Sequence, residues 1–261
     1  MYKGYTPVQY KERAGVWLKR DDLYTVCGVH GGKSRAAYEI ITELIGKGYS
    51  TIVTAGSRQS PQCEIVSYIC EQLGIDCVLF MPTGANTSVI DHIEGNSHTR
   101  IERVRPGYNN VIIARSREYA KDRGYGYVPF GMECVDNVKI TSEQVGNLPF
   151  EELRESGGKL VIPVGSGMSF SSVITGLSQG VGVFDIPILG IQVGKDPTKI
   201  ISEYAEDLEF MNYEIIKSSV DYHTPVTAFI DDVQLDPIYE AKCAEYLRKG
   251  DCLWVVGRRL L

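Results

Sequence analysis

The chain has 261 residues, with 27 lysines and arginines against 33 aspartates and glutamates, which gives a net charge of −6. This length allows one large or two modest domains with a buried core, and the acidic balance argues against a protein whose main partner is a nucleic-acid backbone. No stretch approaches the roughly 20 apolar residues that span a bilayer, and residues 1–5 lack the apolar core of a signal peptide, so we expect a cytoplasmic protein without a membrane partner.

Strand and helix patterns alternate through the first half of the chain. The apolar runs and their breakers predict strands at 16–21, 51–55, 77–81, 99–104 and 125–129, and helices at 33–45, 61–73, 87–94 and 109–123. This alternation is typical of parallel β-α-β units.

The alternation resumes after a looser stretch from Gly131 to Gly158. Strands are predicted at 159–164, 188–193 and 252–256, and helices at 168–178, 197–205 and 237–249. The breaks near Gly48 and Gly131 indicate a smaller α/β domain at 48–131, inserted in a larger domain of residues 1–47 plus 132–261, with a catalytic cleft between the two. The predicted fold class is α/β, with two domains of parallel-rich twisted sheets flanked by helices.

A lysine stands where the first of these strands leads into a helix. Lys33 follows His30-Gly31-Gly32, close to backbone donors and partly shielded from water, and such surroundings can lower the pKa of an amine enough to make it a nucleophile for Schiff-base chemistry. The same pattern also describes a solvated lysine in the first turn of a helix, since most lysines are surface charges.

A second candidate site is the run Gly165-Ser166-Gly167-Met168-Ser169, between a predicted strand and a predicted helix. Such a turn points successive amide N–H groups and the positive end of the helix at one place, which suits a phosphate. The nucleotide-binding patterns Gly-x-x-x-x-Gly-Lys-Ser/Thr and Gly-x-Gly-x-x-Gly with its later acid are absent, which argues against a nucleoside triphosphate or NAD. A glycine turn without a ligand fits the pattern equally well.

A third candidate is the polar run 54–62. Its hydroxyl groups and the helix N-terminus that follows can hold a carboxylate. Ser60 and Pro61 are also an ordinary pair for the N-cap and first position of a helix.

The cysteines and histidines predict neither disulfides nor a metal site. The seven cysteines are scattered without a Cys-x-x-Cys pair, and several lie in apolar elements, as expected of buried thiols in a reducing compartment. The four histidines have no metal-binding spacing with one another or with cysteine.

These pieces, in this order, resemble the pyridoxal-phosphate enzymes of the tryptophan synthase β-subunit-like superfamily (fold type II), and most closely the branch of D-cysteine desulfhydrase and aminocyclopropane-carboxylate deaminase. The segments that carry the resemblance span nearly the whole chain: Leu18-Lys19-Arg20-Asp21-Asp22-Leu23, Gly31-Gly32-Lys33-Ser34-Arg35, Ser60-Pro61-Gln62, Pro129-Phe130-Gly131, Gly165-Ser166-Gly167 and Leu235-Asp236-Pro237-Ile238-Tyr239-Glu240-Ala241-Lys242.

The resemblance implies pyridoxal 5'-phosphate as cofactor and a role for each matching position. Lys33 would form the Schiff base with the cofactor and later move protons at the substrate α-carbon. The phosphate would be held by Gly165, Ser166, Gly167, Met168 and Ser169. Glu240 would approach the pyridine nitrogen, where its ionised form favours strong carbanion delocalisation and its neutral form weakens it. Tyr239 and Ser60 would assist catalysis, and the substrate would be bound by Ser57, Ser60 and Gln62.

Three departures leave the substrate open. Gly32 and Pro61 stand where relatives commonly have Asn, and the segment 255–259 replaces a His-Thr-Gly-Gly run. The chain is also shorter than typical relatives, so the loops that close the cleft are expected to be trimmed.

We therefore expect a lyase or deaminase that labilises a bond at the α-carbon of an amino acid or amino-acid-like substrate, by elimination, deamination or decarboxylation, and the family implies a homodimer. An alternative is a phage-type pyridoxal-phosphate decarboxylase that acts on an amino-acid-modified pyrimidine in DNA. Its basic rim would consist of Arg100, Arg103, Arg105, Arg115 and Arg117, which also fit ordinary solvated faces. A second alternative is a noncatalytic binding module that retains the fold.

Overall fold

The computed structural model describes residues 4–58, 60–107 and 109–257. The chain forms two compact units: the large unit comprises residues 1–24 and 134–261, and the small unit residues 25–133. Residues 25–47, assigned above to the larger domain, thus pack with the small unit. The reason is helix α1 (Gly32–Gly46), which packs against α2 (Pro61–Leu73) and β8 (Gly126–Tyr127).

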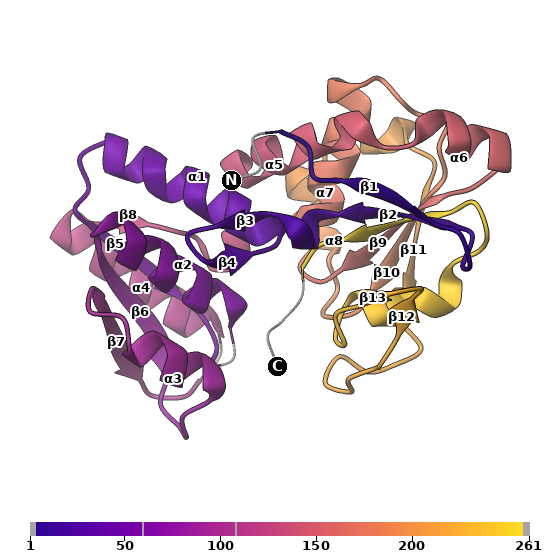
Figure 1. Ribbon diagram of the computed structural model, residues 1–261. Coiled ribbons are helices and arrows are strands. Elements are labelled where there is room, and N and C mark those ends of the chain that lie inside the picture. The colour runs from indigo at the N-terminus through magenta and orange to yellow at the C-terminus, as the bar shows by residue number, and fades with distance from the viewer. Residues whose placement is uncertain (1–3, 59, 108, 258–261) are drawn as a thin grey trace. The chain divides into compact units, whose positions relative to one another are not determined.

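The large unit is built on a six-stranded sheet in the order β1-β2-β14-β9-β10-β11 (Figure 1). Strand β1 runs antiparallel to β2, and the other neighbouring strands are parallel. The strands are β1 (Val8–Lys11), β2 (Val16–Arg20), β14 (Cys252–Val255), β9 (Leu160–Val164), β10 (Ile188–Gln192) and β11 (Tyr213–Lys217). Its α-helices are α5 (Val135–Ser142), α6 (Phe150–Ser156), α7 (Met168–Thr175) and α8 (Thr198–Tyr204).

Both faces of this sheet are covered, as the side chains of β9 show. Ile162 and Val164 pack with Phe170 of α7 on one face. Val161, which points the other way, packs with Cys243 of the 3-10 helix η6 (Glu240–Tyr246). A strand that is buried on both faces reads as an unbroken apolar run, which is why the sequence predicts β9 well.

Shorter elements complete the large unit. Two strands, β12 (Phe229–Ile230) and β13 (Val233–Gln234), form an antiparallel hairpin. The remaining short helices are η1 (Asp21–Leu23), η3 (Glu143–Asn147), the π-helix η4 (Gly176–Gly180) and η5 (Leu208–Phe210).

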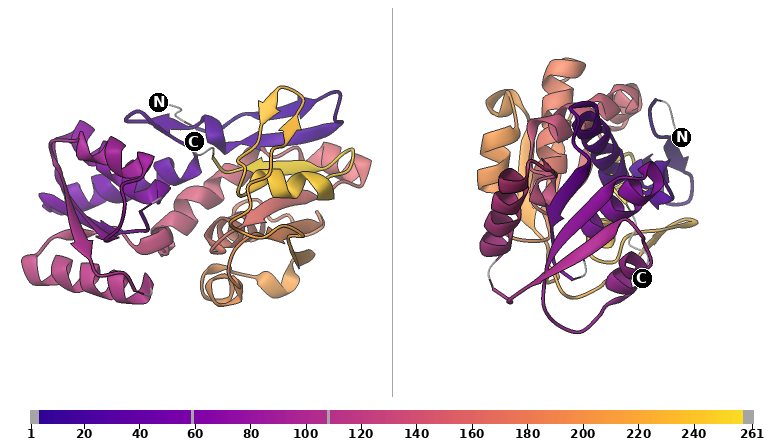
Figure 2. Two further views of the ribbon diagram at one scale, coloured as in Figure 1. Left: turned by 90° about the horizontal axis from the view of Figure 1, so that it is seen from below. Right: turned by 90° about the vertical axis from the view of Figure 1, so that its left-hand side faces the viewer.

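The small unit has a four-stranded parallel sheet in the order β7-β6-β5-β8. The strands are β5 (Thr51–Ala55), β6 (Asp76–Pro82), β7 (Thr99–Val104) and β8. Helices α1 and α2 lie on one face and α4 (Asn109–Arg123) on the other (Figure 2). A hairpin of β3 (Thr25–Val26) and β4 (Val29–His30) precedes α1, α3 (Ser88–Glu94) precedes β7, and the 3-10 helix η2 (Phe130–Met132) ends the unit.

The two parallel-rich sheets, each flanked by helices, confirm the predicted α/β class. Strands β5 and β7 and helices α2 and α4 have the predicted bounds. The stretch 131–158, expected to be looser, contains α5 and α6. The predicted helix at 237–249 is wrong: only Glu240–Tyr246 is helical, and as a 3-10 helix, because Tyr239 has non-helical dihedral angles and Leu247 is extended.

Candidate functional site

The glycine turn 165–167 joins β9 to the N-terminus of α7 in the large unit. Gly167 has φ +111° and packs against Pro197 and Ile201, so only glycine fits there comfortably. In the part of the chain that the structure describes, the amide N–H groups of Ser166, Gly167 and Ser169 donate to no protein acceptor. The turn therefore leaves unused N–H donors at a helix N-terminus, an arrangement that suits a phosphate.

Tyr239 lies against this turn. A β-carbon added at Gly165 would come within 2.9 Å of Tyr239 Cε1. Two amide groups, of Ile238 and Tyr239, donate to Asp236 Oδ1 at 2.8 and 3.0 Å, which holds the chain just before the tyrosine. The predicted phosphate site and the predicted catalytic tyrosine are thus brought together within one unit.

Tyr222 joins this pair, although the sequence carried no signal for it. Its hydroxyl oxygen lies 3.3 Å from that of Tyr239, with the two rings edge to face. A β-carbon at Gly194 would lie 3.6 Å from the carbonyl oxygen of Gly165 and 3.9 Å from Tyr222 Cδ2. Tyr222 comes from the irregular segment after β11, and a side chain on such a segment is placed only by tertiary contacts.

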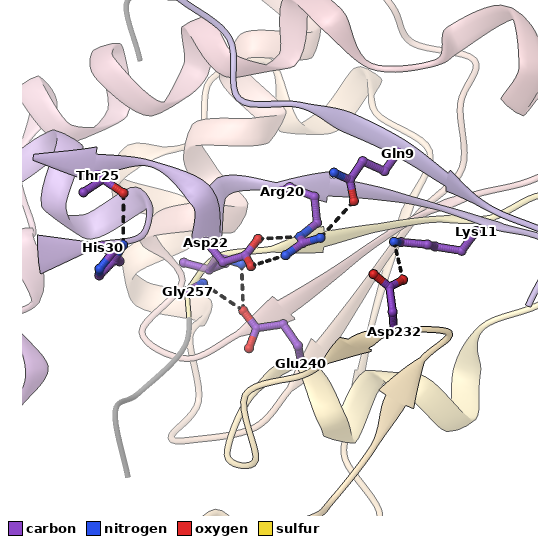
Figure 3. Close-up of polar contacts among 10 residues, drawn as sticks. Gln9, Lys11, Arg20, Asp22, Thr25, His30, Asp232, Glu240 and Gly257 are labelled. Atoms are coloured by element: carbon purple, nitrogen blue, oxygen red, sulfur yellow. Dashed lines mark hydrogen bonds and ion pairs between the residues drawn. The ribbon is translucent and has the colours of Figure 1, made fainter. Parts of the chain in front are cut away.

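Glu240, the next residue after Tyr239, is 1% exposed. Its Oε1 accepts the amide N–H groups of Val256 and Gly257 at 2.7 and 3.3 Å (Figure 3). Burial, with a contribution from Asp236, raises the pKa of the Glu240 carboxyl to about 8.

The other oxygen of this carboxyl, Oε2, is buried without a partner among the described residues. Since Oε1 already accepts two hydrogen bonds, the proton of the neutral acid belongs on Oε2. A buried O–H group without an acceptor is costly for a protein. The Oε2 hydroxyl of neutral Glu240 is therefore well suited to donate a hydrogen bond to an aromatic nitrogen of a bound group.

Lys33 lies in the first turn of α1 in the small unit and is exposed, rather than partly shielded as expected. Gly31 precedes the helix at φ +93°, and Ser34 Oγ donates to the carbonyl of His30 at 2.6 Å. The His30 ring bonds to Thr25 across the β3–β4 hairpin at 3.0 Å. Hairpin and glycine turn thus fix the backbone on which Lys33 stands.

The predicted substrate loop is tied to the sheet of the small unit. A β-carbon at Gly56 would come within 2.7 Å of Ser60 Oγ, so that glycine makes room for the hydroxyl. Gln62 is buried, and its amide nitrogen donates to Thr54 Oγ1 at 2.9 Å and to the Pro129 carbonyl at 2.7 Å. Both donors of this amide are in use, so contact of Gln62 with a substrate carboxylate stays a prediction that would require one of these bonds to break.

The other two polar residues of this loop differ in exposure. Ser57 is exposed and Ser60 half-buried at the N-terminus of α2. Both belong with Lys33 to the small unit, whereas the glycine turn, Tyr239 and Glu240 belong to the large unit. Gln59, within the same run, lies outside the described residues, as do Arg258 and Arg259.

Two of the five arginines in the predicted basic rim are paired within the small unit. Arg100 forms an ion pair with Glu102 at 3.1 Å, and Arg103 with Glu94 at 3.2 Å. Arg117 lies over the ring of Tyr127 at 5.9 Å. These contacts agree with solvated faces of β7 and α4, on which these three arginines interact with neighbouring residues of the same unit.

The seven cysteines are thiols that form no disulfide among the described residues, and five of them are buried. Among the described residues no group of three or more His, Cys, Asp or Glu side chains is arranged to hold a metal ion. Within the same residues, no helix has the length and apolar character needed to cross a bilayer.

Comparisons with known proteins agree with the resemblance in the sequence. The model of a family described as pyridoxal-phosphate dependent enzyme matches residues 1–217. A probable 1-aminocyclopropane-1-carboxylate deaminase of Schizosaccharomyces pombe is 24% identical over 280 residues, which cover 89% of this chain and 80% of that protein. A putative deaminase of the same name from Thermotoga maritima is 24% identical over 287 residues, covering 91% and 86%.

Solved structures share the fold. A crystal structure described as an ACC deaminase homologue has a TM-score of 0.75 at 19% identity and covers 97% of this chain and 89% of its own. Diaminopropionate ammonia lyase of Escherichia coli has a TM-score of 0.64 at 13% identity, with coverage of 98% and 84%. With the family model matching most of its length, the chain belongs to the pyridoxal-phosphate dependent enzymes of fold type II.

Proposed function

We propose that this protein is a lyase or deaminase that labilises a bond at the α-carbon of an amino acid or amino-acid-like substrate. The observation that carries the proposal is the buried Glu240 Oε2, which has no partner among the described residues and belongs to a carboxyl whose pKa burial raises to about 8. Glu240 directly follows Tyr239, the tyrosine packed on the glycine turn. Relatives named as deaminases support the same class of reaction.

The residues of the large unit fit pyridoxal phosphate at both of its ends. Gly165, Ser166, Gly167, Met168 and Ser169 would surround its phosphate, to which the unused N–H groups of Ser166, Gly167 and Ser169 would donate. Glu240 suits its ring nitrogen, to which a neutral carboxyl donates a hydrogen bond without adding a full charge. When bound, the cofactor supplies an electron sink for the carbanion that forms at the substrate α-carbon.

The residues of the small unit supply the amine and the substrate contacts in this proposal. Lys33 would hold the cofactor through its amine, and the same amine would take up or return a proton at the substrate α-carbon. Ser57 and Ser60 bind the substrate carboxylate at the N-terminus of α2, where hydroxyl groups and the helix dipole favour an anion. Tyr239 holds or moves a proton at the leaving group.

A neutral Glu240 bears on how strongly the cofactor delocalises a carbanion. An ionised carboxylate would keep the ring nitrogen protonated and the ring electron-poor, whereas a neutral carboxyl moderates the delocalisation. We place elimination and deamination ahead of decarboxylation because relatives of this chain are named as deaminases. We further propose that the protein works in the cytoplasm as a homodimer, as the family resemblance implies.

The test begins with the absorption spectrum of the purified protein with added pyridoxal phosphate, before and after reduction with borohydride. A visible band that borohydride removes, with the label on the Lys33 peptide, supports the proposal. Lys33→Ala should lose the band, whereas Lys47→Ala, which alters an exposed lysine just after α1, should keep it. A band that survives Lys33→Ala rules out the assignment.

The protein with bound pyridoxal phosphate is then incubated with D- and L-amino acids and with 1-aminocyclopropane-1-carboxylate. The release of ammonia, sulfide and carbon dioxide is measured. Release of ammonia or sulfide supports the proposed class. Carbon dioxide released only from an amino-acid-modified pyrimidine in DNA, with an affinity that falls steeply with salt, would replace it with the DNA alternative. Cofactor attachment without any turnover would favour the noncatalytic alternative.

A further inference from the structure

We infer that Lys242 is a positioning residue of the candidate site. Its buried ammonium group holds the loop that carries Tyr222 and so keeps the Tyr222 hydroxyl beside that of Tyr239. The inference concerns the same site as the proposed function, and it rests on that function only for the chemical use of the tyrosine pair.

Lys242 is 1% exposed, and lysine is almost never buried to this extent unless its charge is satisfied. Its Nζ donates to the carbonyl oxygens of Asp221 and Tyr222, at 2.6 and 3.1 Å. The same atom lies 5.9 Å from the centre of the Tyr222 ring, within the range of a cation–π contact. An apolar side chain of similar size would fill this space but would remove the ammonium donor from both carbonyl groups, of which the Asp221 carbonyl keeps a second donor, the amide of Thr224 at 3.1 Å.

The loop from 218 to 228 needs such a donor, because it lies between β11 and β12 without helix or strand of its own. Contacts elsewhere hold its ends. Near the start, the amide of Ser219 donates to the Tyr246 hydroxyl at 3.2 Å. Near the end, the amide of Val226 donates to the Pro237 carbonyl at 2.8 Å. The middle of the loop, where Tyr222 stands, is held by Lys242.

One short segment contacts Tyr222 at two points. The amide of Lys242 donates to the Tyr239 carbonyl at 3.1 Å, which closes a single turn at the start of η6. The Tyr239 hydroxyl lies beside that of Tyr222, and Lys242 Nζ donates to the Tyr222 carbonyl. The same turn therefore carries both groups that contact Tyr222.

The placement of Tyr222 matters because its hydroxyl is a hydrogen-bond partner of Tyr239 beside the glycine turn. The partner of a phenol influences where its proton lies and how readily it moves. Without the ammonium group, the loop gains freedom and Tyr239 loses this partner. Lys242 thus acts on the site through Tyr222 and does not need to touch substrate.

The first test is hydrogen exchange of the cofactor-free protein, measured by mass spectrometry on wild type, Lys242→Met and Lys242→Arg. In Lys242→Met, exchange in residues 218–228 should rise about tenfold, since a hydrogen bond from a charged group is lost. Lys242→Arg, which keeps charge and donors, should stay near wild type. The control is Lys217→Met, which alters an exposed lysine at the end of β11 and should leave the loop unchanged.

The second test is a double-mutant cycle on turnover. Lys242→Met should lower kcat about tenfold with less change in KM, and it should shift the pH profile of kcat. Lys242→Arg should keep most of the wild-type kcat and a pH profile close to that of the wild type. In the Tyr222→Phe background, the same change should have little further effect, because residues that act through one another are non-additive. Equal losses in both backgrounds would overturn the inference.

The two tests separate this inference from the proposed function. If no amino acid is turned over, the proposed function fails, while the exchange experiment still decides the role of Lys242. If residues 218–228 exchange in Lys242→Met at the same rate as in the wild-type protein, the inference is overturned. If that variant does not fold, Lys242→Gln, which also lacks the ammonium group, takes its place with the same expected and contradicting results.

Discussion

The ring of Tyr239 occupies the space where a side chain at Gly165 would begin, with Tyr239 Cε1 2.9 Å from the position of the missing β-carbon. The backbone at Gly165 has an ordinary φ, so this glycine is required by the tyrosine and not by the turn. A glycine at this point lets an aromatic side chain from a remote segment rest directly on the loop that offers the N–H donors.

This contact predicts the effect of Gly165→Ala. The new methyl group must displace Tyr239, and we expect a loss of about 1–3 kcal/mol in the free energy of unfolding together with a lower kcat. Denaturant unfolding and steady-state turnover measure the two effects. The matched control is Gly180→Ala in the same unit, where an added β-carbon meets nothing within 4 Å; equal effects at both positions would contradict the steric explanation.

Ser166→Asp tests the phosphate site. Ser166 is exposed on the turn, and an aspartate there would repel the cofactor phosphate. Two unit charges about 4 Å apart repel by roughly 1 kcal/mol even in water and by more near a protein surface, so we expect affinity for pyridoxal phosphate to fall about tenfold. Fluorescence titration measures this, with Ser166→Ala as the neutral control. Unchanged affinity in the aspartate variant would place the phosphate elsewhere.

The raised pKa of Glu240 makes the stability of the cofactor-free protein depend on pH. Between its ordinary value of 4.5 and the folded value of about 8, the folded protein keeps a proton that the unfolded chain releases. The free energy of unfolding should therefore fall as pH rises through this window, by up to a few kcal/mol.

Glu240→Gln keeps an acceptor for the amides of Val256 and Gly257 but cannot ionise. Its free energy of unfolding should lack this fall, so the difference between wild type and variant should change steadily from about pH 5 to about pH 8. Urea unfolding at a series of pH values measures this difference, and the control is Glu203→Gln, which alters an exposed glutamate of α8. Parallel curves for wild type and Glu240→Gln would contradict a buried neutral acid.

Thr54→Val tests the support of the substrate loop. Thr54 Oγ1 donates to the Val128 carbonyl at 2.8 Å and accepts from Gln62. Removal of this hydroxyl leaves both buried partners short of a bond and should cost about 1–3 kcal/mol, measured by denaturant unfolding. Thr51→Val is a matched control on the same buried strand, because the Thr51 hydroxyl has no hydrogen bond among the described residues; it should be nearly neutral.

The thiols should react in two classes. Burial raises the pKa of the Cys63 and Cys252 thiols to about 12, and the thiolate is the reactive form. At about pH 8, a disulfide reagent should modify at most Cys27 and Cys134 in the native protein, the two cysteines that are not buried, and all seven after unfolding. Rapid labelling of Cys63 in the native protein would contradict its burial.

Several parts of this protein follow from local sequence. The run Leu160–Val164 is apolar at every position because both faces of β9 are buried, and such a run identifies a central parallel strand. The bounds of helix α2 are predicted by Ser60-Pro61 at its start and by Gly74, which has φ +65°, at its end. The glycine turn and Lys33 were also visible, since each stands at a junction between a strand and a helix.

Other parts required the tertiary structure. The contacts of Tyr239, Glu240 and Lys242 around η6 all reach segments remote in the sequence, and no local pattern encodes them. The same holds for Tyr222, on a loop without periodicity.

The sequence by itself determined the alternation of strands and helices, the family and the motifs that carry its chemistry, because these depend on neighbouring residues and on patterns of burial. Only the tertiary structure decided the raised pKa of Glu240, the contact of Tyr239 with Gly165 and the burial of Lys242. Those properties arise from exclusion of water and from contacts between residues far apart in the chain, such as Glu240 with Val256 and Lys242 with Tyr222, and a linear pattern does not contain them.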